Sequence, residues 1–191
     1  AGGVTTYRYD AQGFPISVTD AAGATQTYRY DVMGNMVERT LPNGATIRTD
    51  YDESGNVIRE VNELGGETTV EYDLLGRIIA ITDPMGAATA YSYDANGNLL
   101  SVTDALRHAT KYTYDKDGNL TSETDALGNR VQYAYTPEGW MSSVTKADGA
   151  VMTFEYDKTG ALTRQNVGDG QSVTSSYNEI GKLTEVSSEA G

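Results

Sequence analysis

The side chains that most often build catalytic sites are scarce in this chain of 191 residues. It has one histidine, His108, and no cysteine. At the equivalent positions elsewhere in the chain stand Asn129 and Ala87. A general base needs a positioned partner, and none is evident for His108. The acidic residues are spread along the chain rather than paired at one place, as a glycosidase would require. We therefore predict no catalytic residues and no enzymatic activity.

One acidic segment invites a metal-binding interpretation. Asp115-Lys116-Asp117-Gly118-Asn119 resembles the start of a calcium loop. An EF-hand loop, however, has its glycine later, ends on a bidentate glutamate and lies between helices. Here the glycine comes fourth and no helical pattern flanks the segment. The sequence favours a tight turn, so we expect neither a metal nor a cofactor.

Asp115 belongs to a motif that recurs through the whole chain, and Tyr93-Asp94-Ala95-Asn96-Gly97-Asn98-Leu99 is its clearest copy. A tyrosine recurs every 21 residues without insertion, and a glycine follows four residues after it. The tyrosines are Tyr9, Tyr30, Tyr51, Tyr72, Tyr93, Tyr114, Tyr135, Tyr156 and Tyr177. The glycines are Gly13, Gly34, Gly55, Gly76, Gly97, Gly118, Gly139, Gly160 and Gly181. A fixed period of this size indicates a repeat architecture. We predict one array of nine repeats over residues 1–191. We expect the repeated tyrosines and glycines, together with Asp94 and Asp115, to have structural roles.

Each repeat reads as a β-hairpin. Residues 88–93 alternate, with Tyr91 and Tyr93 on one face, which is typical of a strand. Asp94 to Gly97 has the chemistry of a tight turn, in which the aspartate bonds the backbone two residues on and the glycine adopts positive φ. A return strand and a second Asp-x-x-Gly turn follow. Arg107 stands where the second glycine is expected, so either that turn differs or Arg107 is left-handed and strained.

These elements predict an all-β fold made of tandem hairpins. Up to eighteen antiparallel strands follow from two strands in each of nine repeats, with the first strands near residues 3–9, 14–19 and 24–30. At about 4.8 Å per strand the sheet is about 85 Å long and only ~24 Å tall, so it must twist or curve. An apolar content of 38% with fourteen tyrosines suits a thin wall better than a thick core. The residues do not indicate which face is interior.

Charge and hydropathy exclude two classes of partner. The net charge of −13 argues against nucleic acid, because phosphate binding needs a basic surface. No apolar run approaches the ~20 residues that a membrane helix needs, and we see no signal peptide. The array begins and ends without an evident cap, so we expect a piece of a longer array. Its two end strands should present unpaired backbone groups, which favour edge-to-edge self-association.

The residues resemble a known family. Tyr-x-Tyr-Asp-x-x-Gly-Asn-Leu, as at 91–99 and 112–120, followed by Thr-Asp-x-x-Gly, as at 82–86 and 124–128, resembles the RHS or YD repeat over essentially the whole chain. The resemblance implies a curved strip that forms a segment of a spiral β-barrel or cocoon. Such shells encapsulate toxins in bacterial polymorphic toxins, delivered for example by type VI secretion, and in insecticidal toxin complexes, and related shells occur in teneurins. Asp83-Pro84-Met85-Gly86 looks like the self-cleaving core signature of the family, but it is in phase with the second turns, so neither cleavage nor toxicity is carried over.

The resemblance implies a non-catalytic wall segment of a shell. Its partners would be neighbouring repeats of the same shell and an enclosed toxin cargo, and it would be secreted or delivered from a bacterium. An alternative is a repeat-based carbohydrate-binding or cell-surface-binding module, since such modules also build hairpins of similar length with aromatic grooves. Those modules usually place a tryptophan in every repeat, whereas this chain has only Trp140, which we expect to be a packing or rim residue.

Overall fold

The structure, a computed structural model, describes residues 3–168 and 170–189, and every regular element in them is a β-strand. The strands that carry the repeated tyrosine are β1 (Thr6–Tyr9), β3 (Thr25–Tyr30), β5 (Thr46–Tyr51), β7 (Glu67–Tyr72), β9 (Ala88–Tyr93), β11 (Ala109–Tyr114), β13 (Arg130–Tyr135), β15 (Val151–Tyr156) and β17 (Ser172–Tyr177). The return strands are β2 (Pro15–Thr19), β4 (Met36–Thr40), β6 (Val57–Val61), β8 (Ile78–Thr82), β10 (Leu99–Thr103), β12 (Leu120–Thr124), β14 (Met141–Thr145), β16 (Leu162–Asn166) and β18 (Leu183–Glu189). The predicted all-β class and the eighteen antiparallel strands are confirmed.

The strands begin slightly later than the sequence predicts. The first three start at Thr6, Pro15 and Thr25, and tight turns occupy the residues before the second and the third. No helix that could span a membrane occurs in the described part of the chain. The ends of the predicted array at 1–2 and 190–191, and residue 169 within it, lie outside the described residues.

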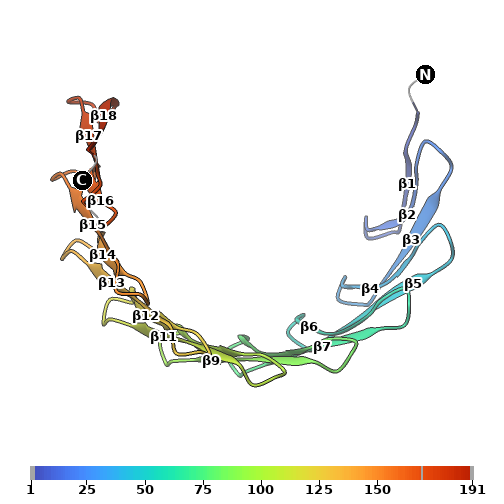
Figure 1. The fold of residues 1–191 in the computed structure, drawn as a ribbon. Helices are drawn as coiled ribbons and strands as arrows, with labels where there is room; N and C mark the ends of the chain where they lie inside the picture. Colours follow the sequence, from blue (N-terminus) through green and yellow to red (C-terminus); the bar gives the residue numbers. More distant parts are fainter. Residues whose placement is uncertain (1–2, 169, 190–191) are drawn as a thin grey trace. The chain divides into compact units, whose positions relative to one another are not determined.

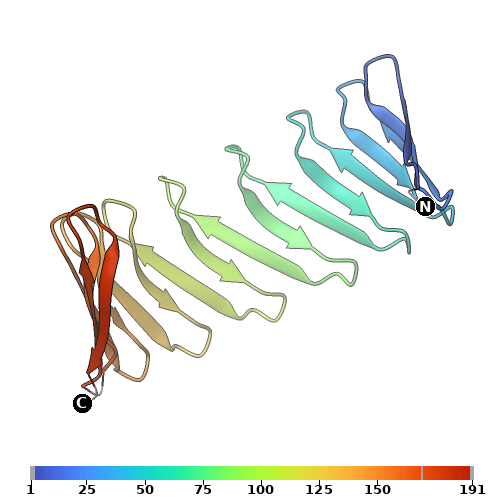
Figure 2. The same cartoon turned by 90° about the horizontal axis from the view of Figure 1, so that it is seen from above.

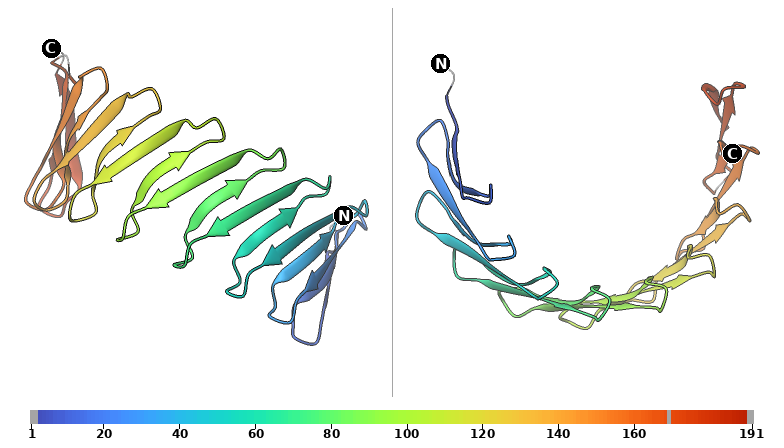
Figure 3. Two further views of the ribbon diagram at one scale, coloured as in Figure 1. Left: turned by 90° about the horizontal axis from the view of Figure 1, so that it is seen from below. Right: turned by 180° about the vertical axis from the view of Figure 1, so that it is seen from behind.

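The chain divides into two compact units, residues 1–91 and 92–191. Within each unit, every strand pairs antiparallel with its neighbours in sequence, so the sheet is a continuous meander (Figure 1). In each unit the tight turns alternate between two opposite edges of the sheet (Figures 2 and 3). The first-turn edge carries the turns from a tyrosine strand to its return strand, and the second-turn edge carries the turns onward to the next tyrosine strand.

The return strands contain a bulge that the sequence analysis did not predict. Arg29 pairs with Glu38 and Tyr30 with Met36, so Val37 is an extra residue opposite the tyrosine strand. The same register shift makes the equivalent residue the extra one in seven other hairpins, namely Ile16, Ile58, Ile79, Thr121, Ser142, Thr163 and Thr184. A bulge bends the strand and interrupts the ladder locally.

Pairing between successive hairpins is incomplete. Strand β2 pairs with β3 only through Ser17, Val18 and Thr19, and β12 pairs with β13 through the equivalent three residues. The half of β3 that contains Tyr28 and Tyr30 has no ladder partner on β2. Successive hairpins therefore separate toward the first-turn edge.

The sheet has no interior in the usual sense. None of the hydrophobic side chains in the described residues is fully buried. In β3, Gln26, Tyr28 and Tyr30 are half-buried, while the residues between them are exposed. We call the side that carries the paired tyrosines the tyrosine face and the other side the opposite face. The prediction of a thin wall in place of a thick core is confirmed.

The opposite face is polar in both units but differs in chemistry. In the first unit, Glu38 accepts from Arg48 at 3.0 Å and lies 3.6 Å from Arg29. Arg59 there bridges Asp50 and Glu67 at 3.0 and 2.8 Å. In the second unit, hydroxyl pairs hold the equivalent positions, with Ser92 and Ser101 at 2.7 Å and Thr113 and Ser122 at 2.7 Å.

Candidate functional site

The turn aspartates accept hydrogen bonds from their own turns. In the turn at Asp115, the Gly118 amide donates to the Asp115 carbonyl at 3.2 Å, and the Asp115 amide donates to the Asn119 carbonyl at 3.0 Å. One carboxylate oxygen, Oδ1, accepts from the amides of Asp117 and Asn119 at 2.9 and 3.0 Å. Gly118 has a φ of 85°, and the other eight first-turn glycines also have positive φ, as predicted.

The second carboxylate oxygen of the aspartate binds the side chain that follows the turn glycine. Asn119 Nδ2 donates to Asp115 Oδ2 at 2.9 Å. The same bond joins Asp31 to Asn35, Asp52 to Asn56, Asp94 to Asn98 and Asp125 to Asn129, at 2.7–3.0 Å. The asparagine side-chain bond, followed by backbone amide bonds, holds the pKa of Asp115 below its ordinary value, because hydrogen bonds to the charged form favour it. We call this five-residue arrangement the Asp–Asn clasp.

His108 occupies the asparagine position of such a clasp. Its Nδ1 lies 2.9 Å from Asp104 Oδ2, its amide donates to Asp104 Oδ1 at 2.8 Å, and its side chain is 61% exposed. Arg77 takes the same place beside Asp73, at 2.7 Å. Arg107, in the turn with His108, has a φ of 69°, so the second of the two predicted options, a left-handed arginine, is confirmed. The geometry gives His108 a structural partner within its own turn.

The acidic segment 115–119 has the geometry of a turn. Asp117 pairs with Lys116 Nζ at 2.8 Å, and both oxygens of Asp115 accept hydrogen bonds from the turn itself. Across residues 3–168 and 170–189, no three His, Cys, Asp or Glu side chains come together in a way that could hold a metal ion.

The repeated tyrosine joins one hairpin to the previous one. Tyr30 donates its hydroxyl proton to the carbonyl of Pro15 at 3.0 Å, across the region where β2 and β3 are unpaired. The same bond runs from Tyr51 to Met36, Tyr72 to Val57, Tyr135 to Leu120, Tyr156 to Met141 and Tyr177 to Leu162, at 2.8–3.0 Å. Burial raises the pKa of Tyr30 and Tyr135. We call this hydrogen bond from the tyrosine hydroxyl to the carbonyl 15 residues earlier the tyrosine clasp. It joins two hairpins where their strands form no backbone hydrogen bonds with each other.

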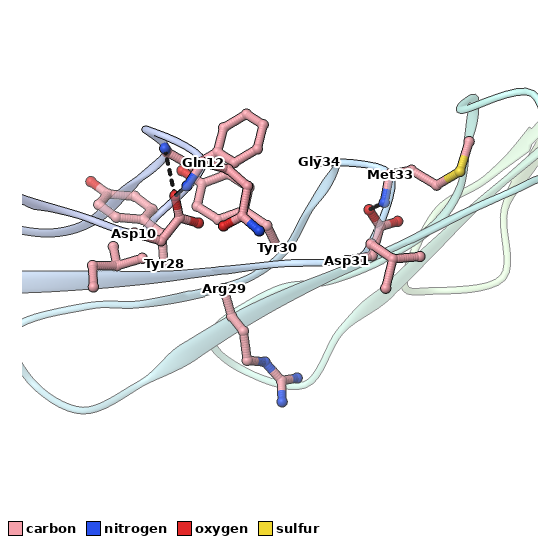
Figure 4. A pocket seen from close by; sticks show the side chains of 11 residues that line it. Asp10, Gln12, Tyr28, Arg29, Tyr30, Asp31, Met33 and Gly34 are labelled. Atoms are coloured by element: carbon pink, nitrogen blue, oxygen red, sulfur yellow. Dashed lines mark hydrogen bonds between the residues drawn. The ribbon is translucent and has the colours of Figure 1, made fainter.

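The separation of the hairpins leaves shallow grooves that recur along the first-turn edge. In the first unit, one groove of about 490 Å³ lies between the turn at Asp10 and the turn at Asp31 and has Tyr28 and Tyr30 in its wall. Figure 4 shows Arg29 directed to the opposite side of the strand from these two tyrosines. Equivalent grooves follow the turns at Asp31, Asp115, Thr136 and Asp157. They are the candidate binding surfaces of this fold.

Two aromatic residues replace the clasp asparagine and cover the next turn. Phe14 stacks on Tyr30 with ring centroids 5.0 Å apart, and Trp140 lies on Tyr156 at 5.4 Å. A β-carbon on Gly160 would lie 2.8 Å from the Trp140 ring, so this glycine is needed for space as well as for its φ. Trp140 is a packing residue, as expected, in contact with Tyr156 and with the turn at Gly160.

Sequence reasoning located the turns and the tyrosines but missed the bulge and the tyrosine clasp. A return-strand residue that is apolar in every copy precedes each clasp tyrosine by 15 residues. The bonded group is the carbonyl of that residue, which every amino acid has. No residue type could therefore have signalled the bond.

Two family profiles match the chain. The Teneurin YD-shell profile matches residues 57–190, and the RHS Repeat profile matches residues 1–25 and 9–46. No curated protein matches the chain by sequence.

Solved structures of toxin complexes share the fold. A crystal structure of TcdB2-TccC3 without its hypervariable C-terminal region matches 98% of this chain with a TM-score of 0.77 and 17% identity. The Photorhabdus luminescens Tc holotoxin pore matches 94% of it with a TM-score of 0.61 and 17% identity. The chain spans 11% and 13% of the length of those two chains.

Proposed function

The chain belongs to the Teneurin YD-shell family, and from this premise we propose that it is a non-catalytic wall segment of an RHS-type shell that encloses a toxin or effector cargo. The observation that carries the proposal is the lack of a core. No hydrophobic side chain in the described residues is fully buried, yet hairpin after hairpin is joined by the same tyrosine clasp. A sheet built in this way divides two spaces without filling either.

The partners follow from the same geometry. Among the residues that the structure describes, β1 pairs with β2 alone and β18 with β17 alone, so each has one free side there, and all seven residues of β18 are exposed. We propose that further repeats of the same shell pair there, which makes residues 1–191 one segment of a longer array. In the absence of those repeats, the free sides should favour edge-to-edge self-association.

The cargo and the cellular location are also proposals. One structural neighbour is a Tc holotoxin pore, which supports a toxin cargo and a protein that is secreted or delivered from a bacterium, by type VI secretion or another route. Phe14 stacks on Tyr30 and Trp140 contacts Tyr156 within the chain, so both rings take part in packing, and no observation favours the carbohydrate-binding alternative.

Electron microscopy and protease protection test the proposal. A polypeptide that continues these repeats on both sides should form hollow particles, and a domain fused behind the repeats should resist protease until the shell is denatured. A solid particle, or a fused domain that is digested as fast as the free domain, would contradict it. Tight binding of one glycan on an array would favour the surface-binding module.

A further inference from the structure

We propose that the two turn edges of this sheet bind each other. When the strip winds around a space, each winding, here called a course, lies beside the next. Exposed apolar side chains of the second turns on one course then bind in the first-turn grooves of the next course. The occupant of the grooves is therefore another stretch of the same repeat. The inference rests on the proposed wall function and specifies how the wall is sealed.

The second-turn edge carries one apolar side chain at the same place in consecutive turns. The third turn residue is Leu64 and then Met85 in the first unit, 89% and 92% exposed. It is Leu106 and then Leu127 in the second unit, 76% and 88% exposed. Single exposed apolar residues need no explanation, but a repeated row suggests a contact surface. The turn depends on an aspartate or asparagine at its first position and on positive φ at its fourth, so these side chains are not required by the local fold.

The first-turn edge offers both grooves and apolar residues. Val32 and Met33 at one turn are 103% and 73% exposed, and Leu74 and Leu75 at another are 105% and 74% exposed. Met33 lines the two grooves on either side of its turn. An apolar side chain that enters from outside would therefore meet Met33 and the tyrosine ring of the groove.

The geometry of a strip selects the pairing. The long edges consist of turns that bond two of their backbone amides internally, so we infer that side chains make the contact between courses. A continuous strip that winds around a space does not turn over, so the second-turn edge of one course faces the first-turn edge of the next. Where they occur in consecutive repeats, the apolar tips and the grooves share the spacing of the repeat, about 9.6 Å along a sheet, so neighbouring tips match neighbouring grooves. The chain spans 11% of the TcdB2-TccC3 chain that it matches, which leaves length for further courses in a protein of that kind.

Charge excludes an electrostatic seam. Acidic residues outnumber basic ones on both edges: the first-turn edge carries Asp31, Asp52 and Asp115 beside Lys116, and the second-turn edge carries Asp83, Asp104 and Asp125 beside Arg107. Like charges repel, and salt screens the repulsion. The contact must therefore be apolar, and it should strengthen as ionic strength rises.

The absence of cysteine allows a direct test on the full chain. Leu106→Cys places a thiol on the second-turn edge and Val32→Cys on the first-turn edge, while Lys111→Cys, an exposed residue within a strand, measures random collision. Under mild oxidation at high salt, mixing the Leu106→Cys and Val32→Cys chains should give more disulfide dimer than either chain alone or than either mixed with Lys111→Cys. Equal yields in all mixtures, or a predominance of Leu106→Cys homodimers, would overturn the proposal.

A second measurement does not depend on trapping. The variant Leu64→Ser/Met85→Ser/Leu106→Ser/Leu127→Ser should reduce the salt-promoted association constant in sedimentation at least tenfold, and the neighbouring Ala105→Ser/Ala126→Ser should leave it unchanged. An unchanged constant in the fourfold variant, or association that weakens with salt, would overturn the seam. Neither result affects the hollow-particle test of the wall function. The proposed contact between the edges can therefore be wrong while the proposed wall function is right.

Discussion

The two edges of the sheet use the same turn but close the sheet in different ways. At the first-turn edge the gap lies between hairpins, and Tyr135 fills it and donates to the Leu120 carbonyl at 2.9 Å. At the second-turn edge the gap lies within a hairpin, because β13 pairs with β14 only from Gln132 onward. There the half-buried Val131 occupies the equivalent place, and other repeats have Gln26, Thr68 or Met152.

The difference explains which positions tolerate change. A hydroxyl that must reach one backbone carbonyl restricts the residue to tyrosine, whereas a gap that needs only partial cover accepts many side chains. The predictions below address this contrast, beginning with the largest expected effect.

Loss of a clasp tyrosine should be the most destabilising change. Tyr135→Ala should lower the free energy of unfolding by about 2 kcal/mol, less than for a fully buried aromatic because the ring is only half-buried. Tyr135→Phe should cost about 1 kcal/mol, the worth of one hydrogen bond. Val131→Ala, across the same strand, should cost less than Tyr135→Ala in urea unfolding. Equal losses for Tyr135→Ala and Val131→Ala would mean that the edges do not differ.

Turn glycines should behave alike on both edges. Gly118 and Gly128 have φ values of 85° and 87°, and an added β-carbon would meet nothing closer than 3.9 Å. Each change to alanine should therefore cost about 1–2 kcal/mol through backbone strain alone. Arg107→Gly should raise stability by about 1 kcal/mol, because it relieves the left-handed arginine. Unequal losses for the two alanine variants would show that the turns, and not only the gaps, differ between edges.

The repeat, the turns and the strand count could all be predicted because side-chain identity determines them. An aspartate and a glycine three residues apart define the turn, and alternation defines the tyrosine strand. The bulge at Val37 could not be predicted, because the repeat length is the same with or without it and its residue changes from isoleucine to threonine between copies. The acceptor of the tyrosine clasp could not be predicted either, since it is a backbone carbonyl. The two units were not predicted, because the period continues through residue 91 without interruption.

The contact of the Trp140 ring with the turn at Gly160 allows a finer test of the first-turn edge. Trp140→Asn restores the asparagine found in other first turns and should cost about 1 kcal/mol of stacking on Tyr156. Gly160→Ala should cost more in the presence of Trp140 than Gly118→Ala does, because the new β-carbon would lie 2.8 Å from the ring. In the Trp140→Asn background the two glycine changes should cost the same. A constant Gly160→Ala cost in both backgrounds would contradict the contact.

The Asp–Asn clasps should give the smallest effect and make stability depend on pH. Four of the five described clasps, including Asp115–Asn119, lie on the first-turn edge. The pKa of Asp115 is lowered from its ordinary value of 3.8 in the folded state, so the unfolded chain binds the proton more readily. The resulting stabilisation is fully present above the ordinary aspartate pKa and is lost as pH falls through the lower folded pKa. Asn119→Ala removes the largest cause of the lowering, so the carboxyl pKa of Asp115 in an NMR titration should rise toward 3.8, and the loss of stability in acid should become less steep. Asn96→Ala, an asparagine change in the first turn of the preceding repeat, serves as the control. It removes a side chain outside the Asp94–Asn98 bond and should alter neither quantity. An Asp115 pKa that stays the same in Asn119→Ala would show that the backbone amides alone hold the carboxylate.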